Sequence, residues 1–189
     1  MKRRTAIKGL LGITGVGVTS FAGYKYFLGA TKHSRGQLKD YYQLISELVD
    51  VIIPPTDTPG AKEALVQDYV IDFMEDCASN KEYNNFLNGL IDLQEDSNLK
   101  FGNSFEECSN ENKIEILKSF ESGVSDGIIS KINNKIKGRS FFNIIRTLTV
   151  EGYCTSTIGA TQHLVYEPVP GRYNAITTLS PNQKAWATR

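Results

Sequence analysis

The chain has 189 residues, 40% of them hydrophobic and 22% charged, which is enough for one globular domain with a core of its own. Its 21 basic and 21 acidic side chains balance, but five of the basic ones lie within residues 1–30, where there is no acidic residue. The remainder is therefore acidic. Because phosphate backbones are bound by basic surfaces, we exclude nucleic acid as a partner.

Residues 1–30 are predicted to be an export signal. A basic start up to Lys8 precedes an apolar run over residues 9–23 and then a more polar stretch. The run is shorter than the roughly 20 residues that a membrane-spanning helix needs, and its glycines disfavour a helix. These features are typical of a signal peptide. Cleavage is expected after Ala22 or Ala30, and the alternative is an uncleaved anchor.

Arg3 and Arg4 indicate the export route. The stretch RRTAIK resembles the twin-arginine motif, in which two arginines precede a variable residue, two mostly apolar residues and often a lysine. Ala6 stands where phenylalanine is commoner, so the alternative is a basic start for the general secretory route. The resemblance implies transport of the folded chain by the twin-arginine translocase, to the periplasm or the outer face of the cytoplasmic membrane.

After a polar linker, predicted for residues 31–40, the pattern is helical over residues 41–189. Apolar side chains recur at spacings of three and four, which is typical of amphipathic helices. The segments with this spacing are residues 41–52, 66–77, 83–91, 114–120 and 141–149. No segment alternates with a period of two. We therefore expect a mostly α fold, a single helical domain with a long ordered C-terminal loop.

The expected helix ends rest on residues that break or cap helices. Pro54 and Pro55 end the first helix, because proline lacks the N–H that a helix needs. Serine is a favoured N-cap, and the expected caps are Ser79 (or Asn80) and Ser109. Ser180-Pro181 is expected to open a short closing helix. The fourth helix is expected to bury Ile114, Leu117 and Phe120.

The sequence lacks the motifs of common catalytic and cofactor sites. It has no glycine-rich dinucleotide turn, no phosphate-binding loop and no Cys-x-x-Cys-His haem site. The two histidines, His33 and His163, are too few for a histidine-based metal site. The only conceivable nucleophile and base are Cys154 and His163; the alternative is a small buried cysteine and a surface histidine. We expect no catalytic, cofactor-binding or metal-binding residue in this chain.

The three cysteines leave the disulfide pattern open. Disulfides persist in the oxidising compartment that an exported chain reaches, but an odd number leaves at least one thiol unpaired. The sequence does not choose among the possible pairings of Cys77, Cys108 and Cys154. Cys77 ends an apolar stripe and is expected in the core.

Two blocks of sequence resemble a known family. The first, LVDVIIPPTDTPGA, covers residues 48–61. The second, over residues 148–173, includes GYCTSTIGAT at 152–161 and YEPVPGRY at 166–173. Both are similar to the gluconate 2-dehydrogenase subunit 3 family, with Cys154 where an aromatic residue is more usual.

The resemblance implies a non-catalytic accessory subunit of a membrane-associated, flavin-dependent sugar or polyol dehydrogenase. FAD and the substrate site belong to a large subunit of the glucose-methanol-choline type, and electrons often pass to a cytochrome c subunit. The small subunit carries the signal, binds the large subunit and escorts it across the membrane. A free-standing exported binding protein with the same fold is the alternative.

Residues 153–173 are expected to supply much of the surface that binds the flavoprotein. Their prolines and glycines restrict the backbone to one shape, which lowers the cost of ordering on association. Tyrosine and arginine are enriched at interface hot spots, so the candidate anchors are Tyr153, Tyr166, Arg172 and Tyr173. The alternative is that the loop wraps the chain's own core, with Tyr166 and Tyr173 inside.

Overall fold

The structure is a computed structural model that describes residues 33–122, 138–169, 171, 176 and 178–187. The chain divides into two units, Met1–His33 and Ser34–Arg189, and the fold below is that of the second. The export signal with Arg3 and Arg4 lies outside the described residues, as do the candidate anchors Arg172 and Tyr173.

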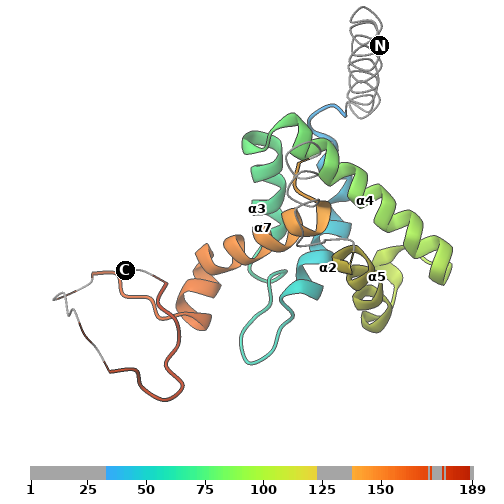
Figure 1. The fold of residues 1–189 in the computed structure, drawn as a ribbon. Helices are drawn as coiled ribbons and strands as arrows, with labels where there is room; N and C mark the ends of the chain where they lie inside the picture. Colours follow the sequence, from blue (N-terminus) through green and yellow to red (C-terminus); the bar gives the residue numbers. More distant parts are fainter. Residues whose placement is uncertain (1–32, 123–137, 170, 172–175, 177, 188–189) are drawn as a thin grey trace, which may run out of the picture. The chain divides into compact units, whose positions relative to one another are not determined.

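The described part of the second unit is helical, so the mostly α prediction is confirmed. The one β-type pairing there is an isolated bridge between Val165 and Trp186. The elements in chain order are η1 (Gln37–Tyr41), α2 (Tyr42–Ile52), α3 (Val66–Asp72), η2 (Phe73–Cys77), α4 (Asn80–Phe101), η3 (Phe105–Glu107), α5 (Asn110–Ser122), α7 (Phe141–Thr155) and η4 (Gly159–His163) (Figure 1).

Local sequence signals explain most helix ends. α2 stops before the proline pair, as predicted. The Ser79 hydroxyl oxygen accepts the N–H of Glu82 and caps α4, and that of Ser109 accepts the N–H of Asn112 at the start of α5. Gly102, in the left-handed conformation that glycine adopts without strain, ends α4.

The domain begins earlier than residue 41, because part of the predicted linker packs onto it. Leu38 is fully buried. The Arg35 guanidinium donates to the carbonyl oxygens of Met74 and Ala78, each at 2.6 Å, and lies over the Tyr83 ring. Carbonyls at a helix end lack partners within the helix, so Arg35 satisfies the end of η2. From Ser34 onward the predicted linker is part of the fold.

The core is organised around α7, which packs against α2, α3, α4 and α5 (Figure 1). Glycines allow the closest approaches. A Cβ on Gly89 of α4 would lie 2.2 Å from the Phe141 ring, and one on Gly152 of α7 would lie 2.6 Å from the Tyr69 ring. The helices therefore approach more closely than side chains of ordinary size would allow.

The buried face of α5 differs from the prediction. Ile114 is 43% exposed, whereas Ile116 and Leu117 are buried together with Lys113. The Lys113 ammonium lies 2.7 Å from the Glu47 carboxylate of α2, so its burial is compensated by an opposite charge. This pairing turns the lysine inward and leaves Ile114 in solvent.

The prediction of a closing helix that begins at Ser180-Pro181 is wrong. The chain instead makes a single turn, in which the N–H of Gln183 donates to the carbonyl of Ser180. Asn182 has a φ of 61°, a left-handed conformation that is incompatible with continuing a right-handed helix. The chain then runs on without a helix to the bridge at Trp186.

Candidate functional site

The described residues contain no group of three or more His, Cys, Asp or Glu side chains placed to hold a metal ion. Within the same part of the chain, no helix combines the length and apolar character needed to span a bilayer.

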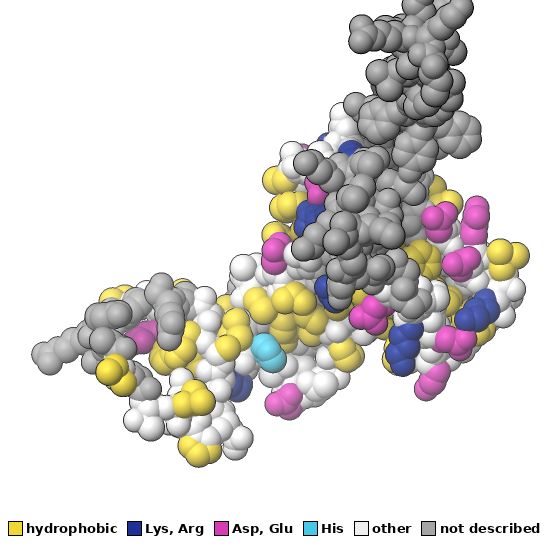
Figure 2. Space-filling view, in the orientation of Figure 1, with side chains coloured by type: hydrophobic (Ala, Val, Ile, Leu, Met, Phe, Trp, Pro, Cys, Tyr) yellow, Lys and Arg dark blue, Asp and Glu magenta, His cyan; other side chains and the backbone are white. Residues whose placement is uncertain are grey.

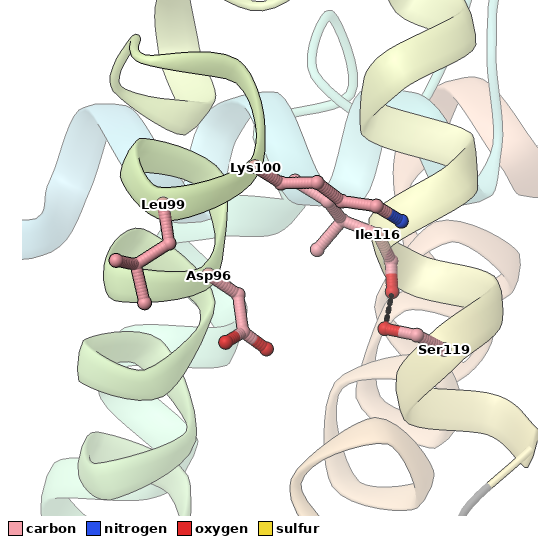
Figure 3. A pocket seen from close by; sticks show the side chains of 5 residues that line it. All are labelled: Asp96, Leu99, Lys100, Ile116 and Ser119. Carbon is pink, nitrogen blue, oxygen red and sulfur yellow. Dashed lines mark hydrogen bonds between the residues drawn. The ribbon is translucent and has the colours of Figure 1, made fainter.

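An open groove of about 390 Å³ lies between α4 and α5 (Figure 3), lined by Asp96, Leu99, Lys100, Ile116 and Ser119. The Lys100 ammonium pairs with the Glu115 carboxylate at 2.6 Å. The Ser119 hydroxyl donates to the carbonyl of Ile116 in its own helix at 2.7 Å. Two of the three polar side chains are thus engaged within the fold.

Cys154 and His163 lie on two successive helices, α7 and η4, which are separated by a break at Ser156. Cys154 is half-buried in the last turn of α7, and His163 is exposed at the end of η4. The His163 ring lies 5.7 Å from the ring of Tyr153, centroid to centroid. Among the described residues the Cys154 thiol makes no hydrogen bond to that imidazole, the contact by which a base activates a nucleophile.

All three cysteines are free thiols. Cys108 is buried, with its sulfur 3.2 Å from the hydroxyl of Ser97. Cys77 is exposed, contrary to the expectation that it lies in the core. The cause is the π-helical turn η2, in which the N–H of Ala78 bonds the carbonyl of Phe73 five residues back. This wider turn shifts Cys77 off the stripe that a 3.6-residue spacing predicts.

Tyr153 connects α7 to the loop that follows α2. Its hydroxyl donates to the carbonyl of Pro59 at 2.7 Å and lies 3.3 Å from the hydroxyl of Thr58. The side chain is only 2% exposed. Tyr153 is therefore a core residue, and its burial does not fit the predicted role of a surface anchor.

The loop after α2, residues 53–60, is called the proline loop below. The N–H of Ala61 donates to the carbonyl of Ile53 and closes its base at 2.9 Å. Across its tip the N–H of Thr56 bonds the carbonyl of Thr58 at 3.0 Å. A Cβ on Gly60 would lie 2.8 Å from the backbone nitrogen of Pro55, so only glycine fits there. The loop thus has one compact, internally bonded shape.

The segment after η4, residues 164–187 as far as they are described, is called the C-terminal arm. It is red in Figure 1. The N–H of Val165 donates to the carbonyl of Ala185, and the N–H of Ala187 donates to the carbonyl of Val165, both at 2.9 Å. The Lys184 ammonium bonds the carbonyl of Gln162 at 2.6 Å. These bonds hold the two ends of the arm together beside η4.

The arm exposes large hydrophobic side chains to solvent. Tyr166 is 47% exposed and Trp186 45% exposed, and the others are Val169, Ile176 and Leu179. In Figure 2 hydrophobic side chains lie open at the left of the view, where Figure 1 places the arm. Exposed apolar side chains gathered on one segment mark an interaction site more often than scattered single ones do.

The sequence identified Tyr166 as an exposed candidate anchor but not Trp186. Trp186 is the one tryptophan of the chain, and tryptophan is strongly enriched at interface hot spots. That signal was available in the sequence. The expectation of a closing helix obscured it, because helix formation would have placed Trp186 on a helix face and not on an extended segment.

The family model described as Gluconate 2-dehydrogenase subunit 3 matches residues 39–171. No curated protein and no solved structure gives a match. The matched range runs from η1 into the arm, so it includes the proline loop, α7 and η4.

Proposed function

The chain belongs to the gluconate 2-dehydrogenase subunit 3 family, and from this we propose that it is the non-catalytic small subunit of a membrane-associated, flavin-dependent dehydrogenase. It binds a large subunit of the glucose-methanol-choline type, which holds FAD and the substrate site. Electrons then pass to a cytochrome c subunit. The twin-arginine signal exports the two subunits together to the periplasmic side of the membrane.

The family match is the observation that carries this proposal, and the arm supports it. The arm is held where its two ends pair, and exposed tyrosine and tryptophan side chains lie at that pairing, which suits a permanent protein contact. Burying those side chains against a partner removes apolar surface from water, which is the main driving force of protein association.

The proposal is tested by purifying the tagged full-length chain from membranes of its own cells. We expect a yellow complex that contains a large FAD protein with dehydrogenase activity on a sugar or polyol. A chain that purifies alone, or only with proteins that lack flavin, contradicts the proposal and favours the free-standing binding protein. The flavoprotein identified in this way is the partner in the experiments below.

Truncation of Tyr166 to alanine is expected to weaken binding to the flavoprotein. Loss of an exposed aromatic that is buried at an interface costs about 2 kcal/mol at a hot spot, or about thirtyfold in the dissociation constant. The melting temperature of the isolated chain should stay near that of the parent, because half of the side chain is already in solvent. The same result is expected for Arg172 and Tyr173.

Tyr42→Ala is the matched control for Tyr166→Ala. Tyr42 is 40% exposed on the first turn of α2, at the opposite end of that helix from the proline loop. The Tyr42→Ala variant should bind the flavoprotein as tightly as the parent chain does. Equal losses for Tyr42 and Tyr166 variants, or no loss for any arm variant, would place the contact elsewhere on the chain.

Replacing Arg3 and Arg4 together with lysine is expected to retain this chain in the cytoplasm, together with the flavoprotein if the latter has no signal of its own. The reason is that the twin-arginine pair is a receptor-read address in which lysine is a poor substitute. Cell fractionation measures the result, with a known twin-arginine substrate carrying the same change as the control. Normal export of the variant in cells that retain the control argues for the general secretory route.

A further inference from the structure

We infer that the proline loop is a second part of the surface that holds the flavoprotein, and that the Tyr153 hydroxyl positions this loop beside the C-terminal arm. The inference rests on the proposed function and deepens it, because it states which surface of the small subunit the partner contacts. It assigns Tyr153 a positioning role within the chain in place of a direct contact.

The loop has an exposed tip and an inner side attached to the domain. Pro54, Pro55, Thr56 and Asp57 are exposed, whereas Gly60 is buried. The inner side is attached through the hydrogen bond from the Tyr153 hydroxyl to the Pro59 carbonyl. A tip with two proline rings and a closed base is already ordered before binding, so it loses little conformational freedom on association. The tip therefore has the properties of a preorganised contact.

The tip of the loop also lies near the base of the arm. The Thr56 hydroxyl donates to the Asp57 carboxylate at 2.9 Å. The pKa of Asp57 lies below its ordinary value of 3.8. The largest cause is this bond from Thr56, followed by the backbone N–H of Asp57 and then by the positive charges of Lys184 and His163. The geometry shows the same proximity. The ring of Tyr153, whose hydroxyl bonds the loop, lies 5.7 Å from that of His163, and the Lys184 ammonium of the arm bonds the carbonyl of Gln162, the residue before His163.

Tyr153 stands at the centre of this arrangement. Its hydroxyl bonds the proline loop, and its ring faces His163 of η4. A Cβ on Gly159 would lie 1.8 Å from the carbonyl oxygen of Tyr153, so η4 begins in direct contact with that residue. The two blocks of sequence that carry the family resemblance are thus joined in space through one side chain. Removal of its hydroxyl detaches the loop from α7, whereas the loop's own backbone bonds and those of the arm remain.

The chemistry of the tip defines what the flavoprotein must present. Two proline rings fit an apolar or aromatic surface, and the exposed Asp57 carboxylate fits an arginine, a lysine or a pair of backbone N–H groups. The partner surface is therefore apolar with a donor or cation at its edge. It is continuous with the part of the flavoprotein that contacts the arm.

Tyr153→Phe tests the positioning role, because phenylalanine keeps the buried ring and loses only the hydroxyl. We expect binding to the flavoprotein to be about tenfold weaker, since a loop that is detached from α7 must be oriented again on association. Tyr83→Phe is the matched control. Tyr83 is equally buried, and its hydroxyl lies 3.1 Å from both the carbonyl oxygen of Ser34 and the carboxylate of Glu75, neither of which belongs to the proline loop. Tyr83→Phe should lower the melting temperature slightly, as Tyr153→Phe does, but should bind the flavoprotein as tightly as the parent chain.

Asp57→Lys tests the tip itself without touching the core, since the side chain is exposed. We expect a small fall in melting temperature, because the new lysine loses the bond from Thr56 and faces Lys184. Binding should weaken by about tenfold or more, because the reversed charge also faces the donor of the partner. If Tyr166→Ala weakens binding while Asp57→Lys and Tyr153→Phe bind as the parent does, the inference about the loop is overturned and the proposed function stands. If the parent chain binds no flavoprotein, the proposed function itself fails.

Discussion

Replacing Glu47 with glutamine is expected to lower the free energy of unfolding by about 3 kcal/mol or more, because removal of one partner of a buried ion pair leaves an uncompensated charge. The Lys113 side chain is 6% exposed, and its ammonium lies 2.7 Å from one oxygen of the Glu47 carboxylate. The Lys62 ammonium lies 2.6 Å from the other oxygen. Glutamine cannot neutralise the buried ammonium, so the cost comes from Lys113.

Chemical denaturation of the isolated domain measures this loss, with Glu82→Gln as the matched control. The Glu82 carboxylate accepts a hydrogen bond from Arg139 at 2.8 Å, but the arginine side chain is 42% exposed. An exposed pair contributes only about 0–1 kcal/mol, so the same substitution there should cost much less. A double variant, Glu47→Gln with Lys113→Met, should recover most of the loss, because an apolar side chain replaces the charge. Equal losses at positions 47 and 82 contradict this account.

The same pair gives the domain a defined dependence on pH. Burial raises the pKa of Glu47, but hydrogen bonds from Lys113 and Lys62 and their charges outweigh it, and the pKa lies below its ordinary value of 4.5. A carboxylate with a lower pKa in the folded than in the unfolded chain stabilises the fold above the unfolded value, and this contribution is lost as the pH falls through the folded value. The stability difference between the parent and Glu47→Gln should therefore shrink below about pH 4.5.

Gly89→Ala is the second change for which we expect a large effect, a loss of about 2–3 kcal/mol in the free energy of unfolding. In an isolated helix the change should help by about 1 kcal/mol, because alanine is the best helix former. In the folded domain the new methyl group would lie 2.2 Å from Cγ and 2.3 Å from Cβ of Phe141. Those atoms lie close to the backbone of α7 and cannot swing away, so α4 and α7 must separate.

Gly152→Ala is the control for Gly89→Ala, since both glycines lie inside helices that pack together. The methyl group at position 152 would meet the ring of Tyr69 at 2.6 Å. Tyr69 is 36% exposed, so its ring has room to rotate toward solvent. We expect a smaller fall in melting temperature than for Gly89→Ala. A loss at position 152 that equals or exceeds the loss at position 89 contradicts the explanation by close approach of α4 and α7.

Local sequence patterns account for the helices of this protein and for several of their ends. The spacing of apolar residues placed α2, α3, α4, α5 and α7, and the proline pair after α2 and the serine caps of α4 and α5 placed several of their ends. These features depend on contacts within a few residues of the chain, which a sequence pattern contains. The family also followed from the sequence, because its two blocks are contiguous stretches with a specific order of residues.

The tertiary structure alone decided which of these residues face inward and which meet. Lys113, and not Ile114, lies on the buried face of α5, because its ammonium pairs with the Glu47 carboxylate of another helix. Tyr153 is buried and not exposed because its hydroxyl reaches a carbonyl in a loop 94 residues away. Cys77 is exposed because a π-helical turn changes the periodicity that the prediction assumed. In the first two cases the decisive partner is remote in the chain, and in the third the regular helical spacing fails, so no pattern of neighbouring residues contains the answer.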